Sequence, residues 1–311
     1  AMGDADAQAA LNRNSAAPPD YDVVVFDTAK MEASLTGDPT KRREGVIKIG
    51  DGTIKISRMP VTTDNPNPPY HFYDEFPPYS QVGGRVLQLE DAAHRIWRGP
   101  PEPGHPDGKL FQETTVGARR DRAGHETRAQ ESYGDAGMVG PKTERAHAHG
   151  AGRGPESPFG ILHAPVEVNQ ALQKRGIEKY LERLRDESPP GLSWHYVTEV
   201  THQGPTPQHG ETRLASVTYR IDVTIKGARV PFAEFRIDID PIPTHKAGAK
   251  VKPSDVKATD LVHISPIGFR DNPHPVIQSI LHDLRELADV PLLTQHGLPR
   301  GERADARAAG G

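Results

Sequence analysis

The sequence predicts an α+β fold, in which a small antiparallel sheet with flanking helices forms a C-terminal domain behind a loop-rich, β-containing N-terminal region. Apolar residues recur at helical spacing over residues 165–185, and three β-rich runs follow between residues 194 and 239. The chain of 311 residues also contains 30 Gly and 30 Pro. Such a composition indicates that much of the chain is loop or extended connection.

The N-terminal region begins with weak signals and then shows clear β-structure. Residues 1–20 are rich in Ala, Asp, Asn and Pro, and we expect them to be disordered. The apolar run Tyr21–Phe26 predicts the first strand. Two short β-rich runs, Val46–Ile49 and Thr53–Ile56, flank Gly50-Asp51-Gly52 and predict a hairpin in which Asp51 serves the turn.

The following stretch is harder to interpret. Prolines exclude a long helix or a central strand from residues 59–79, which we expect to form an irregular surface connection. The pattern at Gly84–Trp97 predicts a strand that runs into a short helix, and Gln112–Val116 is a further strand candidate. Residues 98–140 are mostly Gly, Pro and charged, as expected of a solvated loop. We therefore divide the chain at about Gly140 and leave the role of residues 21–140 open.

The C-terminal part, residues 141–298, is the predicted functional domain. Pro165 suits the first turn of a helix that extends to Arg185, and Gly176 predicts a kink or a break within it. After this helix the sequence predicts three antiparallel strands, a short fourth strand, an amphipathic helix and a frayed tail, at residues 194–200, 214–225, 232–239, 261–264, 275–287 and 299–311.

Composition excludes several classes of protein. There is no cysteine, so neither a disulfide nor a Cys-based zinc site can form. The formal net charge of -4 gives no overall basic field for nucleic-acid binding, although a local basic patch remains compatible with it. No apolar run approaches the roughly 20 residues of a membrane span, and the start of the chain lacks the pattern of a signal peptide. If the protein is exported, we expect a signal-independent machine or a longer polypeptide.

Side chains that can act in catalysis or bind a ligand are most frequent between Glu144 and Arg185. Arg145, His147 and His149 alternate with alanines, which in a strand would place the three on one face. A neutral imidazole accepts a proton near neutral pH, so His147 is the candidate general base, and His149 fits equally well by pattern. Arg145, or Arg153 in the Gly-rich loop that follows, would bind phosphate oxygens.

The helix supplies the remaining candidates. Asn169 is the candidate ligand of a divalent cation, Mg²⁺ or Mn²⁺, and Glu178 is a second ligand or an orienting group. Gln170 and Lys174 would contact substrate. The nine positions from Asn169 to Glu178 correspond to about 900° of rotation in a straight α-helix, so the two lie on opposite faces unless Gly176 breaks the helix.

Purely structural roles would also account for the presence of these candidate residues. His147 and His149 fit the polar edge of a small sheet, and Asn169 fits a local cap at the start of a helix. Glu178 fits a solvated helix charge paired with Lys174. These interpretations stay open at the level of sequence.

Short sequence motifs in this stretch resemble those of a known family. The strings ERAH, GPESP and GILHAPVEVNQALQKRGIE occur in order from residue 144 to residue 178. They resemble the polymorphic toxin type 4 domain, which lies at the C-terminal end of bacterial secreted toxins; the resemblance is dense to about Leu184 and weaker to about Asp240. More distantly, the order of His, Gly-rich connection and Asn-bearing helix resembles ββα-metal (His-Me finger) nuclease toxins.

We therefore expect an antagonistic bacterial toxin that is secreted or delivered into the cytoplasm of a target cell and cleaves nucleic acid with a His base and a divalent cation. The resemblance implies a cognate immunity protein, and delivery implies a secretion apparatus as partner. A metal-independent ribonuclease, with His147 and His149 as an acid–base pair, is an alternative. So is another toxin enzyme, an ADP-ribosyltransferase or a deamidase, although Glu113, Arg119 and Ser132, which lie near one another in the sequence, do not occur in an order that defines such a site. A non-catalytic cargo or binding module is the third possibility.

Overall fold

The protein is described here from a computed structural model. The described residues are 17–18, 20–66, 68, 70–72, 76–89, 94–117, 143–149, 159–166, 168–202, 213–240, 262–269, 275, 277–279 and 282. The expectations for residues 1–16 and for the tail at 299–311 lie outside them.

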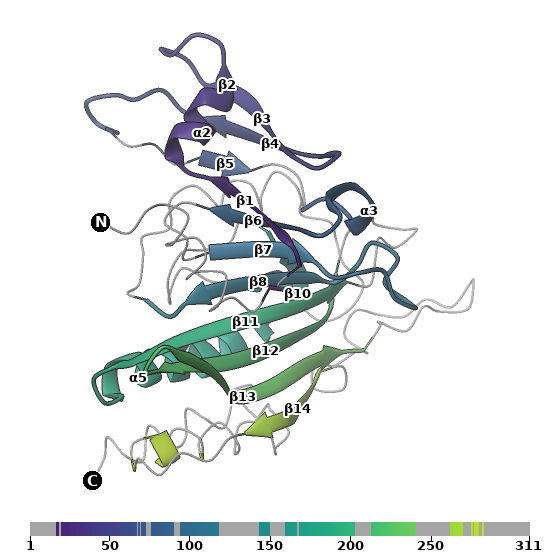
Figure 1. The fold of residues 1–311 in the computed structure, drawn as a ribbon, viewed down its shortest axis with the longest axis vertical. Coiled ribbons are helices and arrows are strands. Elements are labelled where there is room, and N and C mark those ends of the chain that lie inside the picture. The colour runs from purple at the N-terminus through teal and green to yellow at the C-terminus, as the bar shows by residue number, and fades with distance from the viewer. Residues whose placement is uncertain are drawn as a thin grey trace.

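A large mixed sheet organises the molecule (Figure 1). β1 pairs with β6 in parallel, and all other neighbours in this sheet are antiparallel. In spatial order its strands are β1 (Asp22–Phe26), β6 (Arg85–Leu89), β7 (His94–Arg98), β8 (Leu110–Thr115), β11 (Leu192–His202), β12 (Leu214–Ile225), β13 (Ala228–Ile239) and β14 (Val262–Phe269).

The prediction of a small C-terminal sheet is wrong in extent. The three expected strands are present as β11, β12 and β13, but β8 pairs with β11 from Leu110 to Thr115 and so joins β1, β6 and β7 to them. One sheet thus continues across residue 140, where the sequence suggested a division. Local periodicity identifies strands but carries no information about which distant strands pair.

A second sheet lies at the N-terminal end of the molecule (Figure 1). The predicted hairpin at its centre is confirmed, with Gly50 at φ 60° in the turn. Asp27 caps the adjacent helix by accepting a hydrogen bond of 2.8 Å from the Lys30 amide. The elements of this part are α2 (Thr28–Ser34), β2 (Leu35–Thr36), β3 (Arg43–Ile49), β4 (Gly52–Arg58), β5 (Tyr70–Phe72) and α3 (Tyr79–Val82).

Two local predictions are corrected. The strand and helix expected at Gly84–Trp97 are two antiparallel strands, β6 and β7, which are buried on both faces: Val86 and Trp97 pack on one side, Leu87 and Ile96 on the other. Pro165 is the last residue of β10 and does not open a helix. Farther along, the predicted strand at 261–264 is longer, as β14, and the residues described at 275, 277–279 and 282 are helical.

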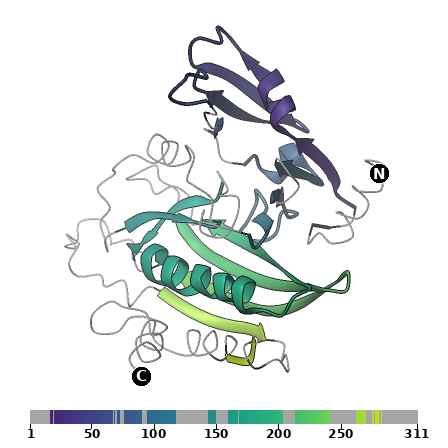
Figure 2. The same ribbon diagram turned by 90° about the vertical axis from the view of Figure 1, so that its left-hand side faces the viewer.

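The helical segment after Pro165 differs from the expected α-helix. Val168–Ile177 form a π-helix, η2, which continues directly into the α-helix α5 (Glu178–Glu187). A two-stranded sheet of β9 (Thr143–His147) and β10 (Ile161–Pro165) precedes it. Figure 2 shows η2 and α5 lying along one face of the sheet that contains β11, β12 and β13.

The two faces of the main sheet have different surroundings. On the helix-covered face, Leu172, Ile177 and Leu184 pack in the main core with Tyr196 and Ile221 of the sheet. Each such side chain contributes roughly 1.5–3 kcal/mol when it is fully buried. On the opposite face a smaller cluster of Val86, Trp97 and Val197 holds the N-terminal strands against β11, with partly buried Ala17 and Tyr21 packed on it.

Candidate functional site

The two predicted histidines have separate environments. His147 is the last residue of β9 and is partly exposed, whereas His149 lies beyond the strand end with none of its surface exposed. The His149 ring stacks on Tyr196 at 4.3 Å and on His94 at 5.5 Å between ring centroids. The expected common polar face is therefore absent, because His149 turns into the core after the strand has ended.

Burial changes the chemistry of His149. Its pKa lies well below the ordinary value, first because burial disfavours the charged ring and then because His94 is close; the Gln112 backbone opposes the shift. Neither ring nitrogen has a partner with hydrogen-bond geometry among the described residues. His149 is a neutral core residue in this arrangement, which leaves His147 as the accessible imidazole of the pair.

The π-helix changes the angle between Asn169 and Glu178 about the helix axis. Bonding from i to i+5 gives roughly 4.4 residues per turn, so nine positions span about two full turns. By this period Asn169 of η2 and Glu178, the first residue of α5, are in phase, where a straight α-helix would put them on opposite faces. Gln173, between them, is close to the same phase. The break expected at Gly176 is not needed, because the wider helical turn alone brings the side chains into one row.

We call Asn169, Gln173 and Glu178 the helix row. Within it, Gln173 contacts the strand that carries His147. Its Nε2 donates to the His147 backbone carbonyl at 2.9 Å and to the Tyr219 hydroxyl at 2.7 Å. Because a carbonyl only accepts, the amide nitrogen must face it, and the orientation of the amide is fixed. Glu178 lies near the same tyrosine: burial raises the pKa of Tyr219, the Gln173 hydrogen bond opposes this, and the Glu178 charge adds to it.

The three side chains of the helix row carry amide or carboxylate oxygen atoms. Gln173 is only 4% exposed, and its Oε1 is buried and accepts no hydrogen bond from the described residues. Asn169 and Glu178 are partly exposed and contribute an amide oxygen and a carboxylate. Oxygen donors of these types suit Mg²⁺ and Mn²⁺. Within the described part of the chain, no three His, Cys, Asp or Glu side chains gather as a metal-binding group.

The other predicted site residues are only partly placed. Gln170 lies on η2 and is partly exposed. Arg145 lies on β9 and Lys174 on η2, but their side chains are outside the described part of the structure. Arg153 lies in the stretch between β9 and β10 that is not described.

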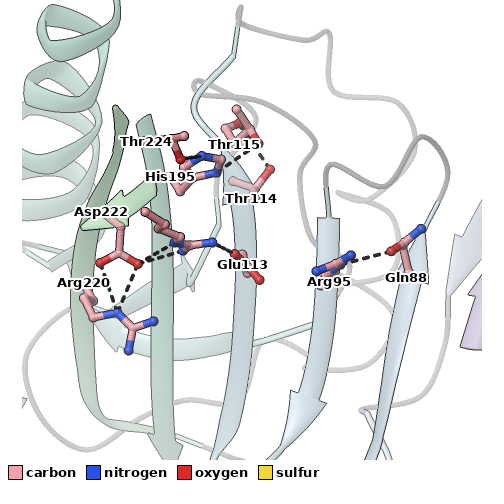
Figure 3. Close-up of polar contacts among 10 residues, drawn as sticks. Gln88, Arg95, Glu113, Thr114, Thr115, His195, Arg220, Asp222 and Thr224 are labelled. Carbon is pink, nitrogen blue, oxygen red and sulfur yellow. Dashed lines mark hydrogen bonds and ion pairs between the residues drawn. The ribbon is translucent and has the colours of Figure 1, made fainter. Parts of the chain in front are cut away.

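A second polar cluster, which sequence reasoning missed, lies on the opposite face of the main sheet (Figure 3). Arg229 on β13 bridges Glu113 on β8 and Asp222 on β12; its Nη2 lies 2.8 Å from the Asp222 carboxylate. His195 on β11 lies between two hydroxyls, with Nε2 3.0 Å from Thr224 and Nδ1 3.3 Å from Thr115. We call these six residues, together with Arg220, the sheet-face cluster.

The sequence contained one signal for this cluster. Arg220, Asp222 and Thr224 alternate with Ile221 and Val223 in the middle of a predicted strand. Such alternation indicates a polar face on a central strand. The partners on β8 could not be inferred, because the pairing of β8 with β11 is not readable from the sequence. Of the residues considered for another toxin chemistry, Glu113 lies in this cluster, whereas Arg119 and Ser132 lie outside the described residues.

Comparison with known proteins places part of the chain in a family. Residues 141–238, from just before β9 to the end of β13, match the family model described as bacterial toxin 4. This segment is therefore a polymorphic toxin domain of that family, and the predicted resemblance is confirmed over about a third of the chain. No curated protein and no solved structure matches the chain. Among the described residues, no helix is long and apolar enough to cross a membrane.

Proposed function

We propose that the protein is an antagonistic bacterial toxin that cleaves phosphodiester bonds of nucleic acid with His147 as general base and a divalent cation, Mg²⁺ or Mn²⁺. One observation carries the proposal: the segment Val168–Ile177 is a π-helix, whose wider turn brings Asn169, Gln173 and Glu178 into phase, and Gln173 donates a hydrogen bond to the His147 carbonyl. The match to bacterial toxin 4 supports the toxin part of the proposal.

Each residue has a defined task in this proposal. His147 accepts the proton of the attacking water, because a neutral imidazole nitrogen is a suitable general base. The oxygens of Asn169, Gln173 and Glu178 would hold the cation, which would neutralise charge on the scissile phosphate. Gln173 also fixes the strand end, since its amide nitrogen holds the His147 carbonyl and the Tyr219 hydroxyl together.

The surrounding groups complete the substrate site. Arg145 and Arg153 carry guanidinium groups suited to bidentate contact with phosphate oxygens, and Gln170 and Lys174 extend the same surface along η2. In the cell, the toxin acts in the cytoplasm of a target cell after export by a secretion apparatus. The producing cell is protected by a cognate immunity protein.

The test uses the purified full chain with plasmid DNA and total RNA, in Mg²⁺, in Mn²⁺ or with a chelator. We expect degradation that requires the cation and is lost in His147→Ala and Asn169→Ala. His263→Ala is the matched control, because His263 is 54% exposed on the edge strand β14 and pairs with Asp240. Thermal melts establish that each variant is folded.

Two results would overturn the proposal. One is intact DNA and RNA under every ion condition despite growth arrest when the chain is produced in the cytosol, which favours a toxin enzyme of another class. The other is full cleavage by folded His147→Ala. Absence of any toxicity would instead favour the non-catalytic cargo.

A further inference from the structure

The short sheet of β9 and β10 has an apolar face and a polar face. Three apolar residues of these strands, each 5% exposed or less, belong to the main core: Ala146, Leu162 and Ala164. Successive side chains of a strand point to opposite faces of its sheet. His147 on β9 and His163 on β10 alternate with the three apolar residues, so both histidines lie on the face that is turned away from the main core.

A residue from a distant part of the chain extends this polar face. Arg213, which immediately precedes β12, forms an isolated parallel bridge with His163. On its other side His163 pairs with Arg145 of β9. Residues at one level of neighbouring strands share a face of the sheet, and His147 lies two positions from Arg145 on that same face. We call Arg145, His147, His163 and Arg213 the basic face of the short sheet.

Arg213 is buried without an opposite charge. It is 8% exposed, and its Nε is sealed from solvent with no hydrogen-bond acceptor among the described residues. Two other buried arginines differ in this respect: Arg229 contacts two carboxylates, and Arg98 donates to three backbone carbonyls. Moving a guanidinium out of water without a counter-charge is unfavourable. A ligand that supplies the negative charge would offset that cost.

The short sheet itself does not balance the charge of its basic face. The acidic residue of β9, Glu144, pairs with Ala164, and its position therefore belongs to the apolar face. Like charges at one level of neighbouring strands repel each other. Two arginines on either side of a histidine are therefore the arrangement expected where an anion binds.

We infer that Arg213 binds a phosphodiester group of the nucleic-acid substrate beside His147. The inference rests on the proposed nuclease function and adds a substrate-binding residue to it. A guanidinium presents parallel N–H donors that match two oxygens of one phosphate. Gln173 of the helix row donates to the His147 carbonyl, so the basic face and the helix row meet at this residue. Arg213 holds the phosphate on the face at which His147 accepts the proton of water.

The test measures binding of a fluorescent single-stranded oligonucleotide, as RNA and as DNA, to the full chain with excess chelator, so that cation-dependent cleavage is suppressed. We expect Arg213→Met to weaken binding about tenfold or more, because charge-assisted hydrogen bonds are lost. The slope of log affinity against log salt concentration should become shallower by about 0.7, the value for one phosphate contact on a single strand. Arg236→Met is the matched control, because Arg236 is 43% exposed on β13 and pairs with Asp238 at 2.7 Å.

Thermal unfolding of the same variants separates a binding role from a structural one. Arg213 is buried without a counter-charge, so its replacement by an apolar side chain should leave the melting temperature unchanged or raise it. An arginine that serves the fold would give the opposite result. A lower melting temperature of Arg213→Met would therefore overturn the inference, as would wild-type affinity or an unchanged salt slope in this variant. Equal losses in Arg236→Met, or no binding by the wild type, would do the same.

The nuclease function and the role of Arg213 can fail separately. Cleavage that requires His147 and proceeds at the wild-type rate in Arg213→Met would leave the proposed function standing and remove Arg213 from the site. Binding that depends on Arg213, without cleavage in Mg²⁺ or Mn²⁺, would leave a phosphate-binding site and refute the nuclease.

Discussion

The two faces of the main sheet bury different kinds of side chain on the same strands. The helix-covered face buries apolar side chains and takes in His149 as a neutral ring stacked on Tyr196. On the opposite face Arg229 contacts the carboxylates of both Glu113 and Asp222 at the centre of the sheet. Polar groups on the first face are tolerated by neutralisation, and those on the second by mutual pairing. The difference predicts that substitutions on the two faces lower the stability of the fold for different physical reasons.

The largest expected effect is on the ion network. Arg229→Ala leaves two buried carboxylates without their shared cation, and we expect it to lower the free energy of unfolding by about 3–5 kcal/mol. Arg236→Ala removes an exposed pair on the same strand and should cost about 0–1 kcal/mol. Chemical denaturation monitored by Trp fluorescence measures both. Similar small losses for the two variants would show that the network is solvated, and the contrast between the faces would disappear.

The pH dependence of stability is the next effect, and it reports on both faces. The pKa values of His149 and His195 are lowered, each first by burial, with His94 adding for His149 and Arg229 adding for His195 while Glu113 and Asp222 oppose it. A folded pKa below the unfolded value near 6.5 means that the unfolded state binds the extra proton as pH falls through 6.5. Stability is therefore complete above that pH and declines below it, by about 1.4 kcal/mol per pH unit for each fully neutral ring.

Substitution separates the two contributions. His149→Phe keeps an aromatic ring in the stack and should remove one part of the slope between pH 6.5 and 5. The part due to His195 should remain. Denaturant unfolding at several pH values makes the comparison, and a slope unchanged in His149→Phe would contradict the neutral core histidine.

A smaller effect is expected where the helix-covered face meets the proposed site. Gln173→Leu removes two hydrogen bonds, to the His147 carbonyl and to the Tyr219 hydroxyl, and should cost about 1–3 kcal/mol, because both groups lose a buried partner. Gln81→Leu, on an exposed residue of α3, is the comparison. Equal melting temperatures for the two variants would show that the Gln173 contacts contribute nothing to stability.

The same contrast explains what the sequence could predict. Strands β11, β12 and β13 and the hairpin of β3 and β4 follow from local alternation and turn residues, which act between near neighbours in the chain. The pairing of β8 with β11 joins residues 80 to 90 positions apart, and nothing local specifies it. Glu113 and Arg229 therefore could not be placed together.

The arrangement of the residues proposed for the site on the helix-covered face could be predicted only in part, for a similar reason. Its residue types were visible in the sequence, but a period of 3.6 was assumed for the helix. The five-residue step from Leu172 to Ile177, both fully buried, reflects the wider π-helical turn that aligns Asn169 with Glu178. His149 was misjudged because strand alternation was extended past the end of β9.

The central claim is that the π-helix forms a cation-binding row, and thermal unfolding of the full chain in Mn²⁺ or Mg²⁺ tests it most directly. Binding to the folded state alone raises the melting temperature as the cation concentration rises. We expect this increase in the wild type and in Glu182→Gln, a substitution one turn farther along α5, and its loss in Glu178→Gln. A melting temperature that is insensitive to both cations in the wild type, or equally sensitive in Glu178→Gln, would contradict the claim.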